Sequence, residues 1–321
     1  MILDKLNFKN KKYNLSNRIS ISPMCQYSAE NGLPTSWHYR HLSNLLLSGA
    51  SLLMIESTAV SKNGKISTKD LCIETSEQKK QLKKLINHLK KINKTPIGIQ
   101  LSHSGRKGSS HIPWEKKNSS LKNKKSWETI SASSIPKDKG WPKPKMMSKT
   151  DIIKLKKKFE IAVKNSKYAN FDFLELHMAH GYLLHQFLSP ISNKREDSYG
   201  GSKINRFKLP LEIARIVRDI WPKYKILGAR ITGNDHLPKG INLKEAVEFC
   251  KELEKIGFDY VCVSSGGIIT KTKLKFKKFF RKNFAKEIKK KTNLKVGITG
   301  MTNDFKIANN YLKKRIFDFI F

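Results

Sequence analysis

The chain has 321 residues, which is enough for one large α/β domain or two smaller ones with a sizeable core. No stretch approaches the roughly 20 consecutive apolar residues of a membrane-spanning helix. Asn, Lys and Tyr crowd residues 7–14, where a signal peptide would need an apolar core, so a cytoplasmic protein is expected. The cysteines are scattered without C-x-x-C or zinc-type spacing, so reduced thiols are expected at Cys25, Cys72, Cys250 and Cys262.

A formal net charge of +38 is the other compositional feature, from 64 Lys and Arg against 26 Asp and Glu. Such a charge admits a nucleic-acid-binding function, which would show a steep salt dependence of oligonucleotide retention. The lysines, however, are spread over nearly every predicted helix face and loop. That distribution favours a solvated basic surface, and we expect no nucleic-acid partner.

Strand-like and helical segments alternate along the whole chain. Short apolar stretches predict strands at residues 18–23, 52–56, 97–101, 173–176, 226–231, 260–264, 295–298 and 316–320. Apolar residues at helical spacing predict helices at residues 37–48, 77–93, 150–170, 207–221, 243–256, 280–291 and 304–314. No composition shift marks a linker, so residues 1–321 are expected to form a single domain.

Eight strands with intervening crossovers favour an α/β fold of the (β/α)₈ barrel type, the TIM barrel, over a doubly wound sheet. No G-x-G-x-x-G follows the first strand, which weakens a dinucleotide-binding interpretation. The last predicted strand lies at the end of the sequence, so the closing helix is expected to be missing. The long segment 102–148, rich in Ser, Lys, Pro and Trp, is expected to act as an active-site cap.

Polar side chains gather after the fourth predicted strand, where His177, His180 and Tyr182 follow one another closely. In a parallel α/β protein the carboxyl ends of the strands are where ligands bind. Other strand ends carry further polar residues: Cys25, Tyr27, Ser57, Gln100 and Arg230. A lone histidine is more often structural, but three such groups together indicate a site. An H-x-x-H metal site is the alternative, and it lacks a third ligand of obvious spacing.

Several long motifs make the chain similar to a known family. They are Ser-Pro-Met-Cys-Gln-Tyr at 22–27, Gly-Ile-Gln-Leu-Ser-His-Ser-Gly-Arg at 98–106, His-Met-Ala-His-Gly-Tyr at 177–182, and Phe-Leu-Ser-Pro-Ile-Ser-Asn at 187–193 with Arg195, Asp197, Tyr199, Gly200, Gly201, Asn205 and Arg206. The chain resembles the Old Yellow Enzyme family of flavin-dependent ene-reductases and NAD(P)H dehydrogenases. The likeness is greatest to the bacterial class with a cysteine after the first strand, and it extends from about residue 3 to the last residue.

The resemblance implies that non-covalent FMN lies across the barrel mouth. By that likeness, the residues lining the isoalloxazine ring are Ser22, Pro23, Met24, Cys25 and Ser57. Gln100 is implied to hydrogen-bond the pyrimidine ring as both donor and acceptor. Arg230 is implied to lie by N1 and the C2 carbonyl, where negative charge develops in reduced flavin. The alternatives are a small buried hydrophobe for Cys25 and a salt bridge for Arg230.

The implied reaction transfers hydride from NAD(P)H to FMN and then to the β-carbon of an α,β-unsaturated carbonyl compound. His177 and His180 are implied to bind the substrate carbonyl oxygen, and Tyr182 to donate the proton to the α-carbon. Tyr27 is implied to line the substrate pocket. Five further residues are expected to be structural: His103, His185, Arg195, Asp197 and Tyr199. A homo-oligomer is possible, and no membrane partner is expected.

Two departures from the family pattern stand out. The family holds the FMN phosphate with the loop after the seventh strand and a Gly-Arg pair after the eighth, and this sequence has Thr299-Gly300 in the first place but no Gly-Arg pair. Weakened FMN binding is therefore expected. The missing closing helix is expected to leave apolar strand surface exposed. The alternative function is a truncated barrel remnant with weak or no flavin binding. The second departure is the lysine-dense segment 268–284, which matches the family poorly.

Overall fold

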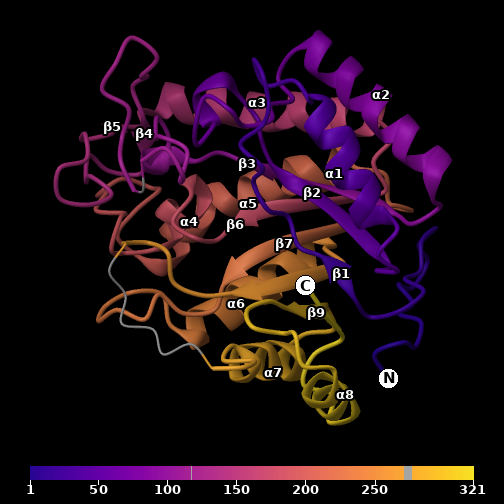
Figure 1. Ribbon diagram of the computed structural model, residues 1–321. Coiled ribbons are helices and arrows are strands. Elements are labelled where there is room, and N and C mark those ends of the chain that lie inside the picture. The colour runs from indigo at the N-terminus through magenta and orange to yellow at the C-terminus, as the bar shows by residue number, and fades with distance from the viewer. Residues whose placement is uncertain (117, 271–276) are drawn as a thin grey trace.

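The fold is a closed ring of parallel strands surrounded by helices. A computed structural model describes residues 1–116, 118–270 and 277–321. The described residues form an eight-stranded sheet in the order β1-β2-β3-β6-β7-β8-β9-β10, with every neighbouring pair parallel (Figure 1). A parallel bridge between Ile19 and Ile320 joins the two ends of this order. The predicted (β/α)₈ barrel is confirmed.

The barrel strands are short and buried. They are β1 (Ser20–Ile21), β2 (Leu52–Ala59), β3 (Ile97–Ser102), β6 (Phe173–Met178), β7 (Ile226–Thr232), β8 (Tyr260–Ser264), β9 (Lys295–Ile298) and β10 (Phe319–Ile320). Small residues make room for large ones inside the ring. A Cβ atom on Gly228 would lie 2.1 Å from the ring of Tyr260, so the glycine allows the tyrosine to cross the interior.

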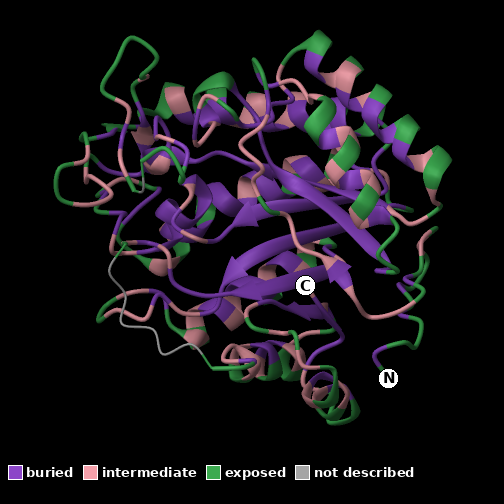
Figure 2. Ribbon diagram, viewed as in Figure 1, coloured by how far each residue is buried: buried purple, intermediate pink, exposed green. Residues whose placement is uncertain are grey.

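Helices cover the outside of the ring. They are α1 (Ser36–Leu46), α2 (Ser76–Ile92), α3 (Lys149–Tyr168), α4 (Leu183–Leu188), α5 (Lys203–Ile220), α6 (Leu243–Ile256), α7 (Lys282–Lys291) and α8 (Phe305–Lys313). Each longer helix buries one stripe and exposes the opposite face, whereas the central barrel strands β2, β3, β6, β7 and β8 are buried throughout (Figure 2). No helix in the described part of the chain is long and apolar enough to cross a membrane.

The segment 102–148 has structure of its own. It contains a turn of 3₁₀-helix, η2 (Gly105–Lys107), and a two-stranded parallel sheet of β4 (Ile130–Ser131) and β5 (Lys145–Met146), which projects from one side of the barrel (Figure 1). Arg195 ties this sheet to the barrel, since its Nη1 donates to the carbonyls of Ala132 and Met147 at 3.0 and 2.7 Å. The guanidinium also bonds Asp197, which gives both residues the structural role expected of them.

Several elements differ from their predicted bounds. The first and last strands pair over two residues each. At the last strand, Ile316 still bonds back to Tyr311 of α8, and the residues in register with β9 are Phe319 and Ile320. Helix α5 begins four residues earlier than predicted, because Ser202 caps it by accepting from the Asn205 N–H. Helix α4 was not predicted.

The expectation of exposed apolar strand surface at the last strand is wrong. Phe319 and Ile320 are 1% and 4% exposed, because β10 pairs with β9 and packs on the barrel core. The poorly matching segment 268–284 lies partly outside the described residues, at 271–276.

Candidate functional site

Polar side chains meet at the carboxyl ends of neighbouring strands. The strand register places Ser57 of β2 beside Gln100 of β3, and His177 of β6 beside Arg230 of β7. A bulge between Ile55 and Ser57 shifts the register of β2, a device that often re-aims side chains at active sites. Four strands thus bring predicted site residues to one end of the ring.

A buried carboxylate that the motifs did not single out lies within this layer. Glu175 is fully buried, and its two oxygens accept from Gln100 Nε2 at 2.7 Å and from the Tyr260 hydroxyl at 3.1 Å. Burial raises the pKa of Glu175, while Arg230, Gln100 and Tyr260 stabilise its charged form. The sequence could have indicated Glu175 as a site residue by its position two residues before His177, which puts both side chains on the same face of the strand.

Arg230 is a buried cation with few partners. It is 8% exposed; its Nη1 donates to Ser22 Oγ at 3.2 Å and its Nη2 to Thr299 Oγ1 at 3.4 Å. Its Nε has no partner, and no carboxylate in the described part of the chain lies within ion-pair distance of it. The salt-bridge alternative is therefore not found. A buried guanidinium that no described carboxylate approaches within ion-pair distance suits a ligand that carries negative charge, as reduced flavin does.

The two histidines of the H-x-x-H motif point their rings at each other. His177 Nε2 and His180 Nδ1 are 3.3 Å apart, and His180 Nε2 lies 2.5 Å from Ser264 Oγ. Burial and then the Arg230 charge lower the pKa of both histidines well below its usual value, so both are neutral at physiological pH. His177 Nδ1 accepts from the Ala179 N–H at 3.2 Å, which places the proton of His177 on Nε2.

The metal-site alternative for this pair gains no third ligand. Among residues 1–116, 118–270 and 277–321, no group of three or more His, Cys, Asp or Glu side chains is arranged to hold a metal ion. The Ser264 hydroxyl beside His180 can either donate to Nε2 or accept from it, so the proton of His180 can lie on either ring nitrogen.

Three further side chains share the electrostatic environment of this site. The Tyr182 ring lies 4.6 Å from the His177 ring at 75°. Burial raises the pKa of Tyr182 well above its usual value, and the nearby Cys25 and Tyr27 add to the effect. Cys25 is only partly exposed, and burial with the charges of Asp70 and Glu56 raises the pKa of its thiol. Both groups therefore keep their protons at neutral pH.

Residues 22–27, which follow β1, differ in how closely they approach the site. Ser22 and Pro23 are partly buried, and Ser22 bonds Arg230. The Met24 side chain is 58% exposed and lies at the surface, so only its backbone could face a bound ring. Tyr27 adopts a left-handed backbone (φ 49°) and packs edge-on against Trp114 of the segment 102–148, with ring centroids 5.6 Å apart. That segment therefore touches a predicted site residue.

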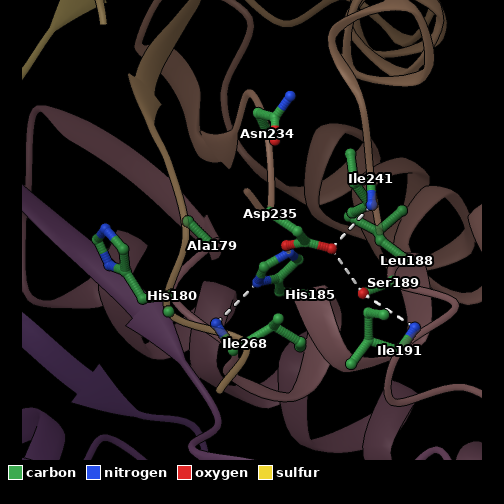
Figure 3. Close-up of polar contacts among 12 residues, drawn as sticks. Ala179, His180, His185, Leu188, Ser189, Ile191, Asn234, Asp235, Ile241 and Ile268 are labelled. Atoms are coloured by element: carbon green, nitrogen blue, oxygen red, sulfur yellow. Dashed lines mark hydrogen bonds and ion pairs between the residues drawn. The ribbon is translucent and has the colours of Figure 1, made fainter. Parts of the chain in front are cut away.

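A second buried network supports the loop that carries His180 and Tyr182. His185 Nδ1 accepts from the Gly181 N–H at 2.7 Å, and its Nε2 lies 2.9 Å from Asp235 Oδ1, with both side chains fully buried (Figure 3). Asp235 also accepts from Ser189 Oγ at 2.7 Å and from the Ile241 N–H at 2.8 Å. His185 thus has the structural role expected of it, linking the β6–α4 loop to the β7–α6 loop.

Fold and site together define a TIM-barrel oxidoreductase of the flavin-binding type, with an amide, a guanidinium and a histidine pair at one mouth. The chain belongs to the NADH:flavin oxidoreductase / NADH oxidase family, whose sequence model matches residues 6–321. The family takes its name from a flavin cofactor, FMN, and from NADH as reductant. The Old Yellow Enzyme resemblance is thereby confirmed.

Individual proteins show the same relationship. The chain is 34% identical to an NADPH dehydrogenase of Geobacillus sp. (strain WCH70) over 309 residues, which cover 96% of this chain and 85% of that protein. A morphinone reductase variant in complex with tetrahydroNAD has the same fold, with a TM-score of 0.80 and 19% identity over 99% of this chain and 85% of that one. A 2-naphthoyl-CoA reductase superposes with a TM-score of 0.88 and 18% identity over 99% of this chain, which spans about half (49%) of that larger protein.

Proposed function

We propose that this flavin-dependent NAD(P)H oxidoreductase reduces the carbon–carbon double bond of α,β-unsaturated carbonyl compounds, with Tyr182 as the proton donor. The observation that carries the proposal is the convergence of His177 Nε2 and His180 Nδ1, 3.3 Å apart, with the Tyr182 ring 4.6 Å from the His177 ring. Two ring nitrogens at this spacing suit one shared oxygen acceptor, and a phenol stands next to them.

The histidine pair binds the substrate carbonyl oxygen. His177 already carries its proton on Nε2, and His180 can carry its proton on Nδ1 when Ser264 donates to Nε2. Both imidazoles are neutral, so the oxygen receives two N–H hydrogen bonds. These donors stabilise the negative charge that develops on the oxygen as the double bond is reduced.

Tyr182 supplies the proton to the α-carbon. Its raised pKa keeps the phenol protonated at neutral pH, as a general acid requires. Tyr27 lines the substrate pocket and packs edge-on against Trp114. Through this contact the segment 102–148 covers the bound substrate. The partly buried site favours a small activated alkene.

The opposite side of the site holds the cofactor. Gln100 binds the pyrimidine edge, Arg230 the N1–C2 edge, and the stretch 22–25 with Ser57 lines the ring. When bound, FMN carries hydride from NAD(P)H to the substrate. A protonated Cys25 thiol beside the ring tunes its reduction potential.

The test separates the two half-reactions of a Tyr182→Phe variant. Reduction of the bound cofactor by NADPH should keep its rate, whereas reduction of an enone such as cyclohexenone should fall by about 10²-fold or more, the usual contribution of a general acid. Tyr224→Phe, at a tyrosine that is 53% exposed, is the matched control. An equal loss in both half-reactions would remove Tyr182 from this role.

The barrel-remnant alternative is decided by flavin content. Gently purified protein that carries about one FMN per chain, seen as yellow absorbance, excludes the remnant. Colourless protein that takes up no added FMN establishes it.

A further inference from the structure

A groove of about 620 Å³ lies among the loops that follow the first three barrel strands. Its walls come from residues 29–31 after β1, residues 62–69 after β2 and residues 124–127 after β3. Loops at the carboxyl ends of barrel strands share one face of the fold, so the groove opens on the same face as the candidate site. Its volume falls within the roughly 300–1,000 Å³ that small-molecule sites occupy.

The groove begins next to the substrate side of the candidate site. Ala29 in its wall lies two residues after Tyr27, so the two Cα atoms are at most about 7 Å apart. The Ala29 N–H donates to the Lys69 carbonyl at 2.9 Å, which joins the loop after β1 to the loop after β2 at this point. A coenzyme whose nicotinamide ring reaches the flavin beside Tyr27 can therefore extend its other end into the groove.

Lysine side chains surround the groove. Its lining includes five of them, which are Lys62, Lys65, Lys69, Lys124 and Lys125. Lys69 lies 4.0 Å from Glu30, whereas the other four ammonium groups have no hydrogen-bond or ion-pair partner among the described residues. The remaining residues, 117 and 271–276, include no Asp or Glu. A concave surface lined by charges of one sign attracts ligands of the opposite sign, so this groove suits a phosphorylated ligand.

One aromatic side chain stands among these cations. Trp127 Nε1 donates to the Asn63 carbonyl at 3.1 Å, and the Trp127 backbone N–H donates to Ser109 Oγ at 3.0 Å. The indole is thus fixed at the groove wall and remains partly exposed. Aromatic rings next to positive charge bind nucleotides, because the base stacks on the ring while the cations bind the phosphates. These features suit a ligand that combines a nucleobase with phosphate.

We propose that this groove binds the 2′-phosphoadenosine end of NADPH, with Trp127 against the adenine and Lys124 and Lys125 at the 2′-phosphate. The assignment rests on the proposed function and extends it to the choice between the two nicotinamide coenzymes. NADH lacks this phosphate monoester, which carries about −1.5 to −2 charges at pH 7. Lysines without carboxylate partners therefore favour NADPH over NADH. Coenzyme A also ends in a phosphorylated adenosine, with its phosphate at the 3′ position, and the test separates the two.

Calorimetric titration with adenosine phosphates tests the groove directly. The wild-type chain should bind 2′,5′-ADP more tightly than 5′-AMP or 3′,5′-ADP. The double variant Lys124→Gln/Lys125→Gln should weaken 2′,5′-ADP binding about two- to thirtyfold, the usual range for two exposed charge contacts, and weaken 5′-AMP binding less. Lys80→Gln/Lys84→Gln, which removes two charges from the exposed face of α2, is the control and should change neither. Equal wild-type affinity for 2′,5′-ADP and 5′-AMP, tighter binding of 3′,5′-ADP, or an equal loss in the control would overturn the proposal.

A pair of substitutions tests the role of Trp127. Trp127→Ala should weaken the binding of both 2′,5′-ADP and 5′-AMP about five- to a hundredfold, the usual contribution of one stacked base. Trp127→Phe, which keeps an aromatic ring but loses the hydrogen bond to Asn63, should retain most of the affinity. Equal losses in the two variants would contradict the adenine contact.

Reduction of the bound flavin links the groove to the coenzyme. Lys124→Gln/Lys125→Gln should raise the NADPH concentration that gives half-maximal flavin reduction, whereas the NADH concentration and the limiting rate should stay unchanged. An unchanged dependence on NADPH would overturn the proposal. Binding of 2′,5′-ADP that depends on these lysines, in a chain that reduces no enone, would keep the groove and reject the proposed function.

Discussion

One carboxylate decides which end of the Gln100 amide faces the mouth of the barrel. Glu175 accepts from Gln100 Nε2 and from the Tyr260 hydroxyl, so the charged form has donors on both oxygens. An acceptor on this side turns the amide nitrogen inward and leaves the amide oxygen and the second N–H for a ligand. The orientation of Gln100 is therefore set by a fully buried residue of the neighbouring strand β6.

Replacing this carboxylate with an amide tests its positioning role. A Glu175→Gln side chain can donate to Gln100 Oε1 and reverse the amide, and it removes the negative charge near Arg230. We expect FMN affinity to fall about tenfold, the cost of one mispaired buried polar group. Titration of FMN fluorescence measures it. Tyr260→Phe, which leaves the Gln100 contact in place, is the control, and an unchanged affinity for Glu175→Gln would contradict the role.

His103 predicts a pH dependence of stability. Burial lowers its pKa to about 4, and its Nδ1 accepts from the Gly105 N–H at 3.0 Å. In the unfolded chain its pKa is about 6.5. Between these two values the unfolded state binds a proton at His103 and the folded state does not, so the free energy of unfolding falls as the pH drops from about 6.5 to about 4.

A His103→Asn variant keeps an acceptor for Gly105 without titrating in this range. Wild-type unfolding free energy should drop relative to the variant by up to roughly 3 kcal/mol over that interval, since one pKa unit corresponds to about 1.4 kcal/mol. Urea unfolding at a series of pH values measures the difference. Parallel pH profiles of the two proteins would rule out His103 as the cause.

At the scale of elements, the site depends on a buried polar contact that joins the β6–α4 loop to the β7–α6 loop. His185 at the start of α4 bonds the Gly181 N–H on one side and Asp235 of the β7–α6 loop on the other (Figure 3). Gly181 lies between His180 and Tyr182, so its position fixes both. Because Nδ1 accepts from Gly181, the proton of the neutral ring lies on Nε2, toward Asp235.

Two substitutions at His185 separate its contacts. In His185→Asn the amide oxygen can still accept from the Gly181 N–H, whereas His185→Leu leaves that buried donor unpaired, at a cost of about 1–3 kcal/mol. We expect the leucine variant to lose more stability in urea and more enone reduction than the asparagine variant. Equal behaviour of the two would show that the Asp235 contact, not the Gly181 contact, matters.

The order of elements follows from the sequence because each strand is a short apolar run between helices with an apolar stripe. The pattern also locates His177, His180, Tyr182, Gln100 and Arg230 at strand ends. It does not reveal which of these groups pair. Glu175 and Gln100 are 75 positions apart, and their contact depends on the β3–β6 register, which local periodicity cannot fix.

Loop segments were the least predictable part. Helix α4 has only six residues, too few to show a helical repeat, and the sheet of β4 and β5 pairs two residues on each side. The lysines around the groove beside Trp127 come from loops far apart in the chain, so the sequence alone does not distinguish them from the other surface cations.

At the scale of the whole molecule, the charge of +38 dominates the electrostatics. Like charges spread over the surface destabilise the compact state, and salt screens them within about 10 Å at 0.1 M. Raising NaCl from about 0.02 to about 0.2 M should therefore raise the melting temperature. A fall in the melting temperature would mean that attraction within the surface ion pairs outweighs the repulsion among the excess positive charges.

The bridge from Ile19 to Ile320, with the Ile320 N–H donating to the Arg18 carbonyl at 2.9 Å, has a consequence during synthesis. Strand β1 leaves the ribosome early, but the neighbour that covers its free edge, Ile320, lies about 300 residues further along the chain and emerges much later. At about 5–20 residues per second the nascent chain keeps an open sheet edge for tens of seconds. Such an edge pairs readily with other chains, so ribosome-associated chaperones are expected to hold this protein until Ile320 has emerged.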